Sequence, residues 1–200
     1  MNESSYDGFV SRHLNRRISR PLARLLAHMP ITPNQISIAS LGVALACCFC
    51  FAYGYYIAGA LLAQASSIVD GVDGDLARLK NMTSAFGGFM DSILDRYADS
   101  LILLGLTIWA ASDSGTYVWV IGFWALASTF VLTYTRARID GPVARPFDRG
   151  ITSVASRDVR LLIVMVGGLL GQGLVTLGIL AVLTNTVVLL RLLAARRILK

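Results

Sequence analysis

The sequence predicts an all-α polytopic membrane protein with six transmembrane helices, preceded by an N-terminal amphipathic helix at the membrane surface. Of the 200 residues, 55% are hydrophobic and 15% are charged, whereas soluble domains carry about 25% charged residues. The mean hydropathy is +0.63, and apolar stretches long enough to cross about 30 Å of hydrocarbon recur along the chain. We therefore predict two parts, a cytoplasmic juxtamembrane helix within residues 1–31 and a transmembrane domain over residues 32–200.

The surface helix is predicted over Val10–Met29, where apolar residues recur at helical spacing and arginines occupy the positions between them. A helix of this kind lies in the interface plane of a membrane. The sequence Thr32-Pro33-Asn34-Gln35 then forms a capping box with proline at the first helical position. The first span is expected to begin sharply there, with its free backbone amides turned toward any anion at the inner face.

The distribution of charge predicts the six spans. Gln35–Tyr53 and Tyr117–Thr135 contain no charged residue, and Tyr55–Val69 leads directly into a cluster of acidic residues. A further span includes the stretch after Asp91. Leu161–Leu190 is also uncharged, but four glycines between residues 167 and 173 divide it into two spans.

The positions of lysine and arginine predict the orientation. If the six spans alternate in direction, the connections near residues 54, 111–117 and 171–174 lie on one side and contain neither Lys nor Arg. The positive-inside rule then places both termini and the acidic cluster at the cytoplasmic face of the cell membrane. Attraction to membrane lipid explains the net charge of +6. Because no basic stripe is interleaved with aromatic residues, we expect no nucleic-acid partner.

Four aspartates in the second and third predicted spans form the candidate site. Asp70 and Asp73 are three residues apart, and Asp91 and Asp95 are four apart, so each pair shares one face of its helix. A charged group in hydrocarbon costs about 2.5–3.5 kcal/mol, so this cluster requires a compensating cation. Carboxylates suit Mg²⁺ or Mn²⁺, and two such ions clamp a phosphoryl group for in-line displacement. The four aspartates are therefore predicted to hold two divalent cations.

The residues around the acids indicate a phosphate ligand. Gly74 and Gly87 allow a ligand to approach the backbone closely. Arg78 lies one turn after Gly74, where a guanidinium can meet phosphate oxygens. Asp75 is expected to point away from this face and to be solvated or paired with an arginine. Asp99 follows Asp95 by one turn, and it either lines the cavity or makes a structural pair.

The chain contains the complete pattern Asp-x-x-Asp-Gly-x-x-Ala-Arg, eight residues, Gly-x-x-x-Asp-x-x-x-Asp, in which Ala77 fills the alanine position. This pattern resembles the signature of the CDP-alcohol phosphotransferase family, and the surface helix with six spans is similar to that family along the whole chain. The resemblance implies an enzyme in which an acceptor hydroxyl attacks the phosphorus distal to cytidine and CMP leaves. It also implies a homodimer.

The same resemblance implies a role for each residue of the pattern. Asp70, Asp73 and Asp91 would hold the metals with help from Asp95, and Asp95 would be the general base. The nucleotide of a CDP-linked alcohol donor would be bound by Asp70, Asp73, Gly74, Ala77, Arg78 and Gly87.

Four arginines suggest the acceptor. Arg136 and Arg138 end the fourth predicted span, and Arg157 and Arg160 begin the fifth, all on the side of the acidic cluster. Such a cluster suits an acceptor that already carries a phosphate, although ordinary positive-inside flanking also explains it. We predict a phosphorylated polyol such as inositol phosphate. The sequence around the acids is similar to the di-myo-inositol-phosphate phosphate synthase module of the family.

Two alternatives stay open. One is a phospholipid synthase that uses CDP-diacylglycerol or an archaeal CDP-lipid with glycerol phosphate or inositol phosphate. The other is a divalent-cation transporter, because aspartates within membrane spans also mark ion pathways. A transporter gives no reason for Gly74, Ala77, Arg78 and Gly87 at these offsets. The three cysteines at positions 47, 48 and 50 are interpreted as packing residues.

Overall fold

The computed structural model of the protein describes residues 15–138 and 154–198, and it contains no strand over these ranges. The helices are α1 (Arg16–Ala27), α2 (Pro33–Ala52), α3 (Tyr56–Leu79), α4 (Ala85–Ser114), α5 (Tyr117–Ala137), α6 (Arg157–Leu169) and α7 (Gly173–Ile198). The predicted all-α class is confirmed.

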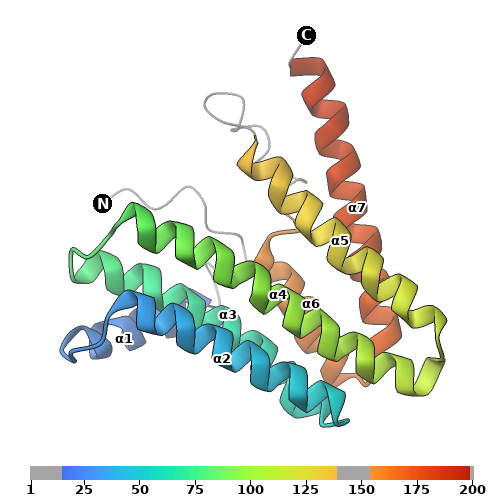
Figure 1. Ribbon diagram of the computed structural model, residues 1–200, viewed down its shortest axis with the longest axis horizontal. Helices are drawn as coiled ribbons and strands as arrows, with labels where there is room; N and C mark the ends of the chain where they lie inside the picture. Colours follow the sequence, from blue (N-terminus) through green and yellow to red (C-terminus); the bar gives the residue numbers. More distant parts are fainter. Residues whose placement is uncertain (1–14, 139–153, 199–200) are drawn as a thin grey trace.

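Helix α4 runs through the middle of the molecule (Figure 1). On one side α2 packs against both α3 and α4, and α1 lies along α3. On the other side α5 and α7 pack against each other and against α4, while α6 packs mainly against α3. Helices α3 and α4 touch each other little. Helix α2 therefore sets the position of the two helices that carry the aspartates.

Local sequence signals explain where the helices begin and end. The predicted capping box is confirmed at α2: the Thr32 amide donates to Gln35 Oε1 at 2.9 Å, and the Gln35 amide donates to Thr32 Oγ1 at 3.4 Å. Helix α4 begins after Ser84, whose Oγ accepts from the Gly87 amide at 3.0 Å. The predicted division of the last apolar stretch is also confirmed, because Gly171, with φ of 70°, lies between α6 and α7.

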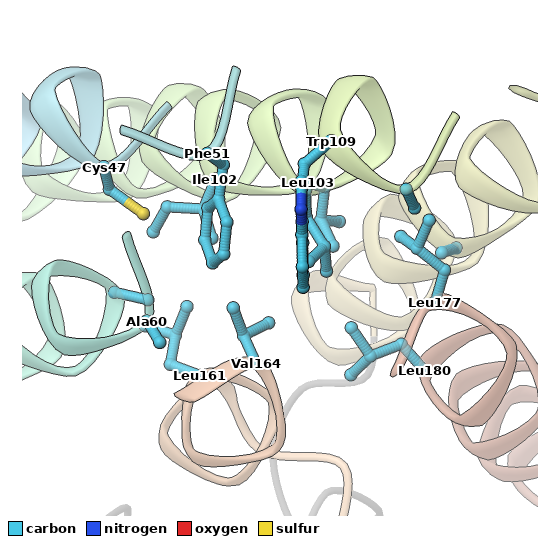
Figure 2. Close-up of a cluster of buried hydrophobic side chains, with 14 of the residues drawn as sticks. Cys47, Phe51, Ala60, Ile102, Leu103, Trp109, Leu161, Val164, Leu177 and Leu180 are labelled. Carbon is cyan, nitrogen blue, oxygen red and sulfur yellow. The ribbon is translucent and has the colours of Figure 1, made fainter. Parts of the chain in front are cut away.

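Figure 2 shows the main core, in which side chains from α2, α3, α4, α6 and α7 point toward one another. The rings of Phe51 and Trp109 stack with centroids 5.7 Å apart, and Leu177 and Leu180 approach from α7. The cysteines are free, and Cys47 is buried in this core with its thiol donating to the Gly59 carbonyl at 3.1 Å. This agrees with their interpretation as packing residues.

Gly105 allows α4 to lie directly against the backbone of α2, since a Cβ added there would be 2.6 Å from Cys48 Cα. Replacing Gly105 with alanine is expected to lower the free energy of unfolding by about 1–3 kcal/mol, because backbone atoms must shift to relieve the overlap. Gly42→Ala on α2 is the matched control, since no atom lies within 4 Å of its added Cβ. Unfolding of both variants in detergent would test this, and equal stability would contradict it.

Within residues 15–138 and 154–198, three helical segments are long and apolar enough to cross a membrane: Pro33–Ala52, Tyr117–Thr135 and Gly173–Arg196. These segments support a membrane protein. Helix α6 has 13 residues and is about 20 Å long, which is shorter than about 30 Å of hydrocarbon. Helices α3 and α4 contain the charged cluster. Six spans therefore stay a prediction.

Within its described residues, the predicted surface helix is α1. It turns the buried side chains of Ser19 and Ala23 toward α3. Its exposed apolar side chains include Ile18, Leu22 and Leu25, at the spacing of one helix face. This two-sided pattern is the one expected for a helix at the membrane interface, although its position at the interface stays a prediction.

Candidate active site

Three of the four predicted aspartates converge between α3 and α4. Asp70, Asp91 and Asp95 each offer one carboxylate oxygen, and these three oxygens lie within 4.8 Å of one another. Asp70 comes from α3 and the other two from α4. This convergence agrees with the spacing argument for these three acids, because each helix turns its acidic face toward the other.

Asp73 lies beside this group of three. Its side chain is buried, and its Oδ2 accepts from Ser37 Oγ of α2 at 2.5 Å. Asp73 and Asp91 both line the same cavity. Ser37 therefore fixes the orientation of Asp73 toward that cavity. This contact could not be predicted from the sequence, because it joins residues 36 positions apart.

A cavity of about 190 Å³ lies between the N-terminal turns of α2 and α4 and the C-terminal half of α3. Polar side chains that the sequence analysis did not select, namely Asn34, Ser37, Thr83 and Ser84, form part of its wall. Six of the eight positions of the sequence pattern also line it: Asp73, Gly74, Ala77, Arg78, Gly87 and Asp91. For the part of the wall that α2 contributes, the signal in the sequence was the capping box at residues 32–35.

Gly87 matters for the shape of this wall. A Cβ added at Gly87 would lie 3.1 Å from Ser84 Oγ and 3.4 Å from Asn34 Oδ1. A larger side chain would therefore press on the residue that caps α4 and on the start of α2. At Gly74 the nearest atoms to an added Cβ are those of the Arg78 guanidinium, at 3.7 Å. Both glycines leave room for a ligand beside the backbone.

Arg157 enters the acidic cluster from the start of α6. Its Nη1 lies 2.7 Å from Asp70 Oδ2 and 2.8 Å from Asp95 Oδ1, and its Nε donates to Asp99 Oδ1 at 3.0 Å. Arg160 donates to the other oxygen of Asp99 at 2.7 Å and to the Ala155 carbonyl at 2.9 Å. Of the two roles considered for Asp99, the structure shows the structural pair. Asp99 anchors both arginines beside the acids.

The remaining charged residues lie at the edge of the site. Arg96 makes an ion pair with the neighbouring Asp95 at 3.2 Å. The expected arginine pairing of Asp75 is confirmed, because its Oδ1 lies 2.6 Å from Arg16 Nη1 and 2.7 Å from Arg78 Nη2. Arg138 is exposed at the end of α5. The side chain of Arg136 lies outside the described part of the chain.

The aspartate cluster fits a divalent cation. Three carboxylate oxygens within 4.8 Å of one another are hard ligands of the kind that Mg²⁺ and Mn²⁺ prefer. The fourth aspartate lies beside them, on a cavity with room for a ligand.

Comparison with known families identifies this arrangement. Residues 30–185 match the CDP-alcohol phosphatidyltransferase family. The chain belongs to this family. The match includes every residue of the acidic pattern, and it confirms the enzyme class, CDP-alcohol phosphotransferase, that the pattern predicted. It favours this class over the cation-transporter alternative.

Relatives within the family have related names. The chain is 41% identical over 194 residues to the "Bifunctional IPC transferase and DIPP synthase" of Rubrobacter xylanophilus, an alignment that covers 97% of this chain and 44% of the relative. It is 34% identical over 174 residues to the "Archaetidylinositol phosphate synthase" of Methanothermobacter thermautotrophicus, covering 86% of this chain and 80% of the relative. The chain thus spans less than half the length of the bifunctional relative.

A solved structure of the family has the same fold. The crystal structure of Mycobacterium tuberculosis phosphatidylinositol phosphate synthase with CDP-DAG bound superposes with a TM-score of 0.70 at 25% identity, covering 89% of this chain and 93% of that chain. The chain therefore shares the helical arrangement of that phosphatidylinositol phosphate synthase.

Proposed function

We propose that the chain is a multi-pass membrane CDP-alcohol phosphotransferase whose active site faces the cytoplasm. It transfers a phosphoalcohol group from a CDP-linked alcohol to the hydroxyl of a phosphorylated polyol such as inositol phosphate, and it releases CMP. The observation that carries the proposal is the convergence of Asp70, Asp91 and Asp95, with oxygens within 4.8 Å, next to a cavity that the rest of the pattern lines.

The cavity is the proposed donor site. Gly74, Ala77 and Gly87 present little side-chain bulk to it, so the cytidine can lie against the backbone. Arg78 reaches it from the end of α3 and contacts the diphosphate. Asp70 and Asp73 complete the nucleotide site.

The four aspartates Asp70, Asp73, Asp91 and Asp95 are the proposed ligands of two divalent cations, Mg²⁺ or Mn²⁺. When bound, these ions offset the charge that builds on the diphosphate during displacement. Arg78 contributes further positive charge on the donor side.

Asp95 is the proposed general base. Its carboxylate takes the proton of the acceptor hydroxyl as that oxygen attacks the phosphorus distal to cytidine. The new phosphorus–oxygen bond forms while the bond to the CMP oxygen breaks, and CMP carries the electron pair away. Asp95 suits this role because it lies on the face of the cluster that α6 and its arginines border.

Arg157 and Arg160 are the proposed acceptor-phosphate residues, assisted by Arg136 and Arg138. Asp99 fixes the first two beside Asp95, so a phosphate bound to them would bring a hydroxyl of the same molecule near the base. The name of the archaetidylinositol phosphate synthase refers to inositol phosphate, which supports a phosphorylated inositol as acceptor.

The donor has two candidates. CDP-inositol is favoured by the 41% identity to the bifunctional relative. A CDP-lipid such as CDP-diacylglycerol is favoured by the synthase that contains CDP-DAG and by the archaetidylinositol phosphate synthase, 80% of which the chain covers. We further propose a homodimer, on the family resemblance.

Purified protein is expected to release CMP from CDP-inositol or CDP-diacylglycerol when inositol phosphate and Mg²⁺ are supplied. EDTA is expected to abolish release, and added Mg²⁺ or Mn²⁺ to restore it, because the carboxylates alone repel the diphosphate. The measurement is CMP by chromatography. Absence of CMP with both donors across several phosphorylated and neutral acceptors would reject the reaction, and release unaffected by EDTA would reject the metal.

A further inference from the structure

We propose that Arg16 of α1 is a positioning residue for the donor site: by pairing with Asp75, it leaves the positive charge of Arg78 available to the diphosphate. The inference deepens the proposed function and rests on it, because it takes the cavity lined by Arg78 as the site of a nucleoside diphosphate.

Helix α3 turns one face toward the candidate active site and another toward α1. One carries the acids of the cluster and the residues that line the cavity. The other faces α1: a Cβ added at Gly71 would lie 3.5 Å from Ser19 Oγ, and Asp75 follows Gly71 by one turn. Arg78 stands between these faces, since it lines the cavity and also pairs with Asp75.

Asp75 joins the two arginines through one oxygen. Its Oδ1 accepts from Arg16 Nη1 at 2.6 Å and from Arg78 Nη2 at 2.7 Å, while its Oδ2 accepts from Ser19 Oγ at 3.2 Å. The Asp75 side chain is 12% exposed and that of Arg78 is 53% exposed. The carboxylate is thus held from the α1 side, and the guanidinium of Arg78 extends into the solvent-exposed cavity.

Electrostatics gives Arg16 its role. Asp75 and Arg78 alone would form a neutral pair, which attracts a diphosphate weakly. With Arg16 added, these three side chains sum to one positive charge at the mouth of the cavity. Arg16 and Arg78 donate to the same Asp75 oxygen, so Arg16 neutralises part of the negative charge of Asp75. The other N–H groups of Arg78 can then donate to phosphate oxygens.

Other contacts hold α1 on α3 without Arg16. At one end, Asn15 Nδ2 donates to Ser67 Oγ at 2.9 Å, and Gln64 Nε2 donates to Asn15 Oδ1 at 2.7 Å. At the other end, Lys80 Nζ donates to the carbonyls of Met29 and Ile31 at 2.6 and 2.8 Å. A variant at Arg16 is therefore expected to keep α1 in place.

The test compares Arg16→Gln with Arg17→Gln, which removes the same charge from the next, exposed position of α1. Arg16→Gln is expected to weaken CDP binding and to raise KM for the donor by about twofold to tenfold, with kcat little changed, because the net positive charge of the three side chains beside the diphosphate is lost. Arg17→Gln is expected to match the unaltered protein. CDP affinity is measured by calorimetry on the full chain in detergent, and KM from CMP release.

The double variant Arg16→Gln/Asp75→Asn separates charge from structure. It restores one positive charge beside the cavity, so CDP affinity is expected to return toward that of the unaltered protein. If Arg16→Gln behaves like Arg17→Gln, or if the double variant binds CDP more weakly than Arg16→Gln, the inference is wrong. If the unaltered protein binds CDP and follows this pattern but releases no CMP, the inference stands and the proposed reaction fails.

Discussion

Asp95→Asn is expected to lower kcat for CMP release by about a hundredfold to ten-thousandfold, the range that a positioned general base contributes. Asparagine keeps the shape of the side chain but cannot accept the proton of the acceptor hydroxyl. The measurement is the initial rate of CMP formation at saturating donor, acceptor and Mg²⁺.

The control is Asp113→Asn, an exposed aspartate near the far end of the same helix, which is expected to keep full activity. Asp95 also belongs to the group of three acids, so Mn²⁺ binding is measured in parallel. If Asp95 contributes little to metal binding, the Asp95→Asn variant loses turnover but keeps the Mn²⁺ affinity of the unaltered protein. Full turnover in Asp95→Asn would reject Asp95 as the base.

The placement of the aspartates on shared helix faces could be predicted because the information for it is local. Offsets of three and four residues put Asp70 with Asp73 and Asp91 with Asp95 on shared helix faces, and this placement does not depend on how the helices pack. The capping box at Thr32 is equally local, since both of its hydrogen bonds join residues three apart. Such signals survive in a single sequence.

The contacts that complete the site could not be predicted in the same way. Ser37 reaches Asp73 across 36 residues, and Arg157 reaches Asp99 across 58 residues. Both contacts depend on how α2 and α6 pack on α3 and α4, which the helix pattern alone does not specify. This is why the sequence could group Arg136, Arg138, Arg157 and Arg160 as one basic cluster but could not separate the two that Asp99 anchors.

Helix lengths were also harder to predict than helix positions. The uncharged stretch 161–190 divides at its glycines as expected, but the 13 residues of α6 begin with charged side chains that turn toward the acids of α3 and α4. Arg157 and Arg160 therefore belong to the site as well as to the boundary of an apolar segment. The positive-inside rule considers only where arginines lie along the sequence. It therefore cannot distinguish an arginine that only flanks an apolar segment from one that also contacts the acids of the site.

Arg157→Gln is expected to lower the free energy of unfolding by about 3–5 kcal/mol in the presence of EDTA, because it leaves Asp70, Asp95 and Asp99 without their shared guanidinium. The Arg157 side chain is 15% exposed, so water reaches this position poorly and offsets little of the negative charge left on the unpaired carboxylates. Mg²⁺ or Mn²⁺ is expected to recover a large part of the loss, since a divalent ion at the same acids replaces the missing charge.

Denaturant unfolding with EDTA and with Mn²⁺ measures this difference, and Arg138→Gln at the exposed end of α5 is the matched control. Arg138→Gln is expected to change stability by less than about 0.5 kcal/mol in either condition. If the destabilisation of Arg157→Gln were the same with and without Mn²⁺, Arg157 and the metal would not share these carboxylates. In that case Arg157 would act through Asp99 alone, as part of the packing between α4 and α6.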